Sequence, residues 1–168
     1  PSQFDFIVKI ITSVPVDTLE FDECIDGNDA SKLFDILSSI EQFQHIPKIS
    51  LKSIHISSID NLCNLLSCSK KISLDSCDIE VIPFLQKLTE VNKQIECINL
   101  RGNLGNTFNN TTIHLPKTLN KIKLDMISWK GATFIGLLPI LLSHQPTNGN
   151  YRLSIAEVDI STSDWDHA

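Results

Sequence analysis

A short alternation of apolar and polar residues recurs along this chain. Its two best copies, residues 49–56 and 72–79, both have apolar side chains at their first, third, sixth and eighth positions. Apolar residues at every second position indicate a short β-strand with one buried face. Weaker copies begin at Leu19, Ile98, Ile122 and Leu153, so successive starts are 30, 23, 26, 24 and 31 residues apart. We therefore predict strands near residues 18–22, 48–52, 71–75, 97–101, 121–125 and 151–155.

The segments between these strands mostly have helical periodicity. Apolar residues spaced three or four positions apart predict helices at 29–44, 59–66, 81–91 and 134–142. Ser58 is placed to cap the second of them, and Pro83 suits the first turn of the third. Residues 105–118 are rich in Asn and Thr and are predicted to form an irregular connection, while residues 1–15 look like the end of a preceding unit.

Because each strand repeats the pattern of its neighbour, we expect the strands to stack in parallel. Their inward side chains would then form a continuous apolar ladder, since one unit alone cannot cover its apolar face. The expected ladder is Leu19/Phe21, Ile49/Leu51, Ile72/Leu74, Ile98/Leu100, Ile122/Leu124 and Leu153/Ile155.

A strand-plus-helix unit recurring at this interval resembles the leucine-rich repeats, and specifically their ribonuclease-inhibitor-like class. The resemblance covers nearly the whole chain. It implies an α/β solenoid of about six strands, with a curved parallel sheet on the concave face and mostly helices on the convex face. It also implies one domain over residues 1–168, a fragment or part of a longer chain. Among intracellular members, the segment 115–124 is similar to the repeat domain of CARMIL-type cytoskeletal regulators.

The turn after each strand is the least regular part of the repeat. In the family this position usually holds Asn or Cys, whose side chain satisfies backbone groups. Here the position is occupied by Cys24, Ile54, Cys77, Asn103, Ile127 and Val158. We expect packing to hold the three turns whose residue is aliphatic.

Composition and charge limit the class of protein. The chain has 168 residues, 42% of them hydrophobic and 20% charged, as in globular domains. A formal net charge of −6 argues against nucleic-acid binding, which needs a basic stripe. The apolar run at 134–142 is too short to span a bilayer. Five cysteines, an odd number without the spacing of a secreted framework, favour the cytoplasm.

We find no pattern typical of an enzyme, a cofactor site or a metal site. The five histidines show no metal-ligand spacing with Cys or carboxylates. Cys63 and Cys68 lack the second half of a zinc site and are interpreted as core thiols. Phosphate-binding loops and nucleophile elbows are absent from the sequence.

The outward residues of the strands are the candidate binding surface. The row that precedes each motif is Thr18, Lys48, Lys71, Cys97, Lys121 and Arg152, of which four are basic. This row suits an acidic partner segment, the alternative being a solvated row that discourages aggregation. The row Asp22, Lys52, Asp75, Arg101, Asp125 and Ala156 alternates in sign and favours structural cross-strand pairs. We predict a partner-binding set of Lys48, Ser50, Lys52, Lys71, Ser73, Asp75, Asn99, Arg101, Lys121, Lys123 and Asp125.

The sequence therefore predicts an intracellular module that binds another protein, in cytoskeletal or signalling regulation. Two alternatives remain. Leucine-rich repeat GTPase activators use polar residues at strand ends to orient a catalytic residue of the GTPase, and Arg101 and Asn103 occupy such an end. Asn103 is equally the structural Asn of the repeat. The other alternative is a structural spacer, and an uncovered terminal strand would permit self-association.

Overall fold

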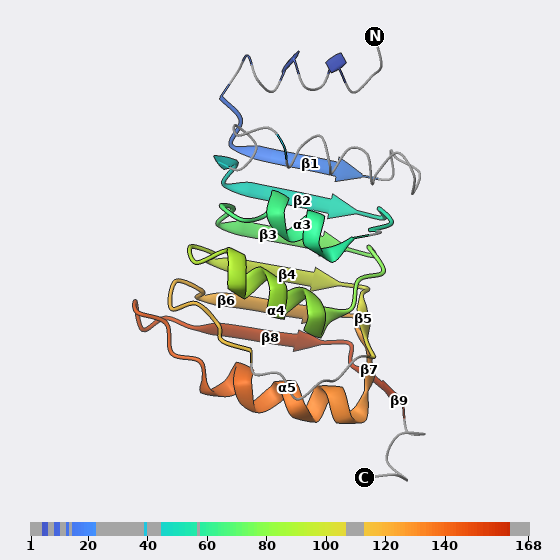
Figure 1. Ribbon diagram of the computed structural model, residues 1–168. Coiled ribbons are helices and arrows are strands. Elements are labelled where there is room, and N and C mark those ends of the chain that lie inside the picture. The colour runs from blue at the N-terminus through green and yellow to red at the C-terminus, as the bar shows by residue number, and fades with distance from the viewer. Residues whose placement is uncertain are drawn as a thin grey trace.

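The computed structural model describes residues 15–22, 45–56, 58–106 and 113–161, together with residues 5, 6, 9, 10, 13 and 39. These residues form an α/β structure around a six-stranded parallel sheet in which each strand pairs with the next along the chain (Figure 1). Its strands are β1 (Thr18–Asp22), β2 (Lys48–Lys52), β3 (Lys71–Asp75), β4 (Cys97–Arg101), β6 (Lys121–Asp125) and β8 (Arg152–Ala156). Five strands have the predicted bounds, and the sixth begins one residue later than predicted.

The pairing register is the one that the repeated motif predicts. Ile49 of β2 pairs with Leu19 of β1 on one side and with Ile72 of β3 on the other, and the pairing continues in the same register to β8. From β1 to β6 the inward side chains are buried. Those of β8, Leu153 and Ile155, are only half-buried. The apolar ladder is therefore least covered at the last strand.

Helices lie on the inward side of this sheet. They are α3 (Ile59–Leu65), α4 (Val81–Val91) and α5 (Gly131–Ser143) among the described residues. The α3 and α4 helices stack in the same order as the strands (Figure 1). The Ser58 hydroxyl accepts a hydrogen bond from the Asn61 N–H, at 3.2 Å, and so caps α3 as predicted.

Proline has a different place in each of the two later helices. Pro83 lies in the first turn of α4, where the backbone N–H would be unpaired anyway. Pro139 lies inside α5. The helix predicted at residues 29–44 and the predicted end of a preceding unit at residues 1–15 lie mostly outside the described residues.

A second, smaller parallel sheet was not predicted from the sequence. It consists of β5 (Leu104–Gly105), β7 (Ser128–Lys130) and β9 (Asp159–Ser161). The prediction that residues 105–118 are irregular is thus wrong at Gly105. Residues 113–118 contain neither helix nor strand, and residues 107–112 are not described.

The indole of Trp129 packs directly over Gly105 in this small sheet. A Cβ atom added to Gly105 would lie 2.2 Å from Cε3 of Trp129, so only glycine fits. Trp129 is buried and also meets the ring of Phe134 edge-on, with the centroids 5.4 Å apart. These contacts join the small sheet to α5.

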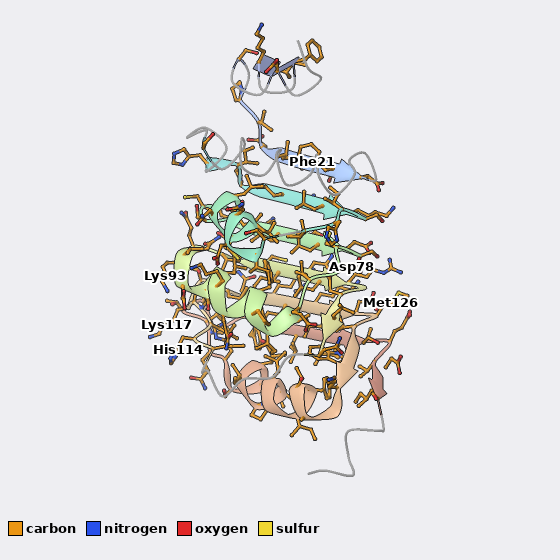
Figure 2. All side chains as sticks on the ribbon, turned by 45° about the vertical axis from the view of Figure 1, so that its right-hand side comes forward. Phe21, Asp78, Lys93, His114, Lys117 and Met126 are labelled. Atoms are coloured by element: carbon orange, nitrogen blue, oxygen red, sulfur yellow. The ribbon has the colours of Figure 1, made fainter. Side chains whose placement is uncertain are left out.

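The strands β2, β3, β4, β6 and β8 are each followed by a residue with positive φ, such as Met126 after β6 (Figure 2). This residue is Ser53, Ser76, Gly102, Met126 or Glu157, with φ between 49° and 62°. In the first four of them the N–H donates to the carbonyl of the last residue of the following strand, at 2.8–3.2 Å. The left-handed turn therefore bends the chain off each strand while extending the hydrogen-bonded ladder by one step.

A ladder of side-chain hydrogen bonds holds the opposite edge, where the strands begin. The carbonyl two residues before a strand accepts a hydrogen bond from a polar side chain of the following unit. The four bonds are Ser69 to Ile46 (3.1 Å), Asn92 to Ser69 (2.8 Å), Thr118 to Ile95 (2.8 Å) and His144 to Leu119 (2.7 Å). Different residue types thus make the same bond in successive units, which hides the pattern from a sequence comparison.

The turn residues behave as predicted in all but one described case. Asn103 is buried and makes three hydrogen bonds, whereas Ile54 and Ile127 are buried by packing. Val158 is 41% exposed. The prediction that packing holds its turn is wrong, because the structure has no described unit beyond β8 to cover it. Cys24 lies outside the described residues.

Candidate partner-binding face

The face of the six-stranded sheet that points away from α3 and α4 is the candidate site, and we call it the exposed face. Three parallel rows of side chains cross it, one from each outward position of the strands. The first row is Thr18, Lys48, Lys71, Cys97, Lys121 and Arg152. The middle row is Glu20, Ser50, Ser73, Asn99, Lys123 and Ser154. The last row is Asp22, Lys52, Asp75, Arg101, Asp125 and Ala156.

The last row neutralises most of its own charge. Lys52 lies 3.4 Å from Asp22, and Arg101 lies 3.9 Å from Asp125. Asp75 accepts a hydrogen bond from the Ser76 hydroxyl, at 2.8 Å. The Lys52–Asp22 pair is exposed, and pairs of this kind contribute about 0–1 kcal/mol. The row thus supplies cross-strand pairing, as the alternating signs predict.

Asp125 requires a correction to the predicted binding set. The residue is only 9% exposed, because Arg101 and Lys123 cover its carboxylate. A partner would have to displace both cations to reach it. Asp125 is therefore not expected to contact a partner, contrary to the prediction from the sequence.

The first row carries positive charge that the protein itself does not neutralise. Lys48, Lys71, Lys121 and Arg152 are all exposed. Lys48 lies 3.8 Å from Glu20. Within the described part of the chain, the other three cations have no carboxylate within ion-pair distance. In a protein of net charge −6, this row is therefore a local basic surface.

An open hollow of about 250 Å³ lies beside the first row, over β2, β3 and β4. Its polar lining comes from the first and middle rows: Glu20, Lys48, Ser50, Lys71, Ser73, Cys97 and Asn99. The Asn99 amide donates to the Ser73 hydroxyl, at 3.3 Å, while its Oδ1 atom is buried without a partner among the described residues. The hollow therefore combines two ammonium groups, of which that of Lys48 pairs with the Glu20 carboxylate, with a thiol and small hydroxyl and amide groups.

The Cys97 thiol is the uncharged centre of the first row. Burial raises its pKa, against the opposing effect of Lys121 and Lys71 on either side. The thiol is thus neutral at physiological pH. Two pairs of cations, one on β2 and β3 and the other on β6 and β8, flank it.

The structure brings together most of the predicted binding residues and adds three. Apart from Asp125, the predicted residues are exposed or half-buried on this one face. Arg152, Cys97 and Glu20 were not in the predicted set. The first two belong to a row that the motif spacing identified, so the signal for them was present. Glu20 carries no such signal, because its contact with Lys48 depends on the diagonal geometry of β1 and β2.

Asn103 is not available to a partner. Its side chain is buried, and its amide and carbonyl atoms bond to Cys77, Leu74 and Arg101 at 2.9–3.1 Å. The Arg101 guanidinium is exposed and contacts the Met126 sulfur, with Nη2 3.2 Å from Sδ. In this arrangement the polar atoms of Asn103 are already engaged, so a GTPase activator could use the Arg101 side chain but not that of Asn103.

Two cysteines, Cys63 in α3 and Cys77 after β3, are core residues. Burial raises the pKa of Cys63 to about 12, and Cys77 is buried with its sulfur 3.5 Å from the Leu51 carbonyl oxygen. Cys68 is half-buried at the end of α3. Within the described ranges, no three His, Cys, Asp or Glu side chains gather closely enough to hold a metal ion. The prediction that Cys63 and Cys68 are core thiols is consistent with the burial of Cys63, whereas Cys68 is only half-buried.

Comparisons with known proteins give no relative for this chain. No protein-family model matches the sequence, and neither a curated protein nor a solved structure is significantly similar to it. Among the helices of the described residues, none is both long and apolar enough to cross a membrane.

Proposed function

We propose that this chain is a leucine-rich repeat solenoid that binds another protein through its exposed face. The support for the architecture is the regular succession of parallel strands in one register, together with the left-handed residue that follows each of β2, β3, β4, β6 and β8. In this proposal the six-stranded sheet is the concave face of the solenoid and α3, α4 and α5 belong to its convex face. A role in cytoskeletal or signalling regulation follows from the resemblance to CARMIL-type proteins.

The observation that carries the binding role is the contrast between the first and last rows. The last row pairs its opposite charges within the sheet, whereas Lys71, Lys121 and Arg152 of the first row have no such partner among the described residues. A row of like charges on neighbouring strands destabilises the sheet slightly. A protein that binds an acidic surface gains both association rate and specificity from such a row.

The proposal includes a cytoplasmic location. Cys63 and Cys77 are buried as free thiols in the core. Thiols that pack as apolar side chains suit a reducing compartment, where disulfides are rare.

Affinity capture with charge-reversed variants tests this function. The first variant carries Lys48→Glu, Lys71→Glu and Lys121→Glu. Its matched control carries Lys87→Glu, Lys93→Glu and Lys130→Glu, which change the net charge equally but lie on α4, just after α4 and on β7. The proteins captured from a cell extract by each are identified and quantified by mass spectrometry.

We expect the wild type and the control to capture the same partner and the exposed-face variant to lose it. Circular dichroism of both variants verifies that they are folded. If the exposed-face variant retains every captured protein, binding through this face is wrong. If the control loses the partner as completely as the exposed-face variant, total charge rather than the exposed face governs capture.

A further inference from the structure

We propose that the exposed face binds an extended, acidic protein segment that runs along the first row, across the strands. This inference rests on the proposed function and names the chemistry of the partner. Its basis is the spacing of the first-row cations, three of which (Lys71, Lys121 and Arg152) have no ion-pair partner among the described residues, together with the polar hollow beside them.

The spacing of the cations matches an extended chain. Neighbouring strands lie about 4.8 Å apart, so the four spacings from Lys48 on β2 to Arg152 on β8 cover about 19 Å. An extended segment rises about 3.3 Å per residue, and about six residues cover that distance. Side chains on one side of such a segment recur every second residue. Acidic residues at alternate positions therefore meet the row at both of its cation pairs.

The centre of the row selects against a continuous run of charge. Cys97 separates Lys71 from Lys121, so the distance between these cations is about two strand spacings, or 10 Å. The neutral thiol between them suits a small or apolar residue. A segment with two acidic patches around one uncharged residue is thus the best complement.

The hollow provides hydrogen bonds that charge alone does not. Ser50 and Ser73 line it beside Lys48 and Lys71. Their hydroxyl groups can donate to a bound carboxylate, since a charge-assisted hydrogen bond is stronger than a neutral one. Because Glu20 already pairs with Lys48 on one side of the hollow, an acidic side chain is best held on the other side, at Lys71 and Ser73.

Binding of a defined peptide tests the inference. The probe is a fluorescein-labelled eight-residue peptide of alternating glutamate and glycine, whose binding is measured by fluorescence anisotropy at low and at physiological salt. An eight-residue lysine peptide and an eight-nucleotide oligothymidine serve as comparisons. The variant carries Lys71→Gln, Lys121→Gln and Arg152→Gln, and its control carries Lys87→Gln, Lys93→Gln and Lys130→Gln.

We expect the acidic peptide to bind in a salt-dependent way and the lysine peptide not to bind. Three exposed charge contacts together change affinity by about tenfold, so the first-row variant should bind at least that much more weakly than the control. The inference is overturned if the two variants bind the peptide equally well, if the peptide does not bind, or if oligothymidine binds more tightly through the same cations.

Alkylation of the cysteines gives a second measurement on the unmodified protein. Cys97 lies in the first row, and Cys68, which is also half-buried, lies at the end of α3. The acidic peptide should slow iodoacetamide labelling of Cys97 and leave Cys68 unaffected, as read by peptide mass spectrometry. Equal labelling of Cys97 with and without bound peptide would contradict the proposed path.

The two proposals fail in different ways. If the first-row variant loses the captured partner but the acidic peptide does not bind, the exposed face binds a partner of other chemistry and the inference alone is wrong. If the peptide binds but capture does not depend on the exposed face, the proposed function is wrong.

Discussion

Replacing Asn103 by alanine should lower the free energy of unfolding by about 3–4 kcal/mol. The buried side chain accepts a hydrogen bond from the Cys77 N–H and donates to the Leu74 and Arg101 carbonyls. Alanine leaves the Cys77 N–H without its acceptor and takes one donor from each of the Leu74 and Arg101 carbonyls, of which that of Arg101 keeps its bond from the Ser76 N–H. Because these groups belong to β3, β4 and the turn after β3, the loss weakens the contact between two neighbouring units.

The matched control is Asn99→Ala, on the same strand as Arg101. Asn99 is half-buried and makes one side-chain hydrogen bond, to the Ser73 hydroxyl. Its replacement should cost less than about 1 kcal/mol. Urea unfolding followed by circular dichroism measures both. Equal losses for the two variants would mean that the three bonds of Asn103 do not hold the turn.

Replacing Asn92 by alanine should cost about 3 kcal/mol. Asn92 follows the last turn of α4 and is fully buried. Its amide donates to the Leu66 and Ser69 carbonyls at 2.7 and 2.8 Å, and its Oδ1 atom accepts from the Gln94 N–H. These bonds connect the end of α4 with the chain that leads into β3.

Two further variants separate hydrogen bonding from packing at this position. Asn92→Asp keeps the side-chain volume but brings a carboxylate against two carbonyl oxygens, so it should destabilise at least as much as alanine. Ser69→Ala removes a single bond of the same ladder, 3.1 Å long, and should cost about 1 kcal/mol. Thermal and urea unfolding of the three proteins measure the differences. A nearly neutral Asn92→Asp would contradict the role of the amide donors.

The large sheet was predictable because its signal is periodic. Ile49 and Leu51, Ile72 and Leu74 alternate with polar residues, and a one-residue slip would expose both members of each pair. The last strand is predicted at residues 151–155 but spans Arg152–Ala156, one residue later. Tyr151 precedes the strand and is half-buried beside His144, so its apolar ring extends the pattern without belonging to the strand.

The small sheet was not predictable for the opposite reason. A strand of two residues such as Leu104–Gly105 is too short to show any period. Its position depends on Trp129, which packs over Gly105 from another unit. Contacts of this kind join residues that are distant in sequence. Because the repeat tolerates many residue types at these positions, the sequence shows no pattern that predicts such contacts.

The sequence predicts which side chains share a row of the candidate site, but not which of their charges are paired or buried. The motif spacing places Lys71, Lys121 and Arg152 in one row, and the register agrees. Sequence could not show that Asp125 is covered by Arg101 and Lys123, because side-chain burial depends on which cations bend over it. Only the ion pairs of the structure show that Lys71, Lys121 and Arg152 have no carboxylate beside them among the described residues.

The most direct test of binding through the exposed face is a lysine footprint of the complex with a captured partner. Free and bound protein are acetylated briefly, and the labelling rate of each lysine is read by mass spectrometry. Lys48, Lys71 and Lys121 lie in the first row, whereas Lys87 and Lys93 lie on and just after α4. The proposal predicts slower labelling of the first three and unchanged labelling of the last two. Protection of Lys87 and Lys93 with the first row still labelled at its free rate would contradict it.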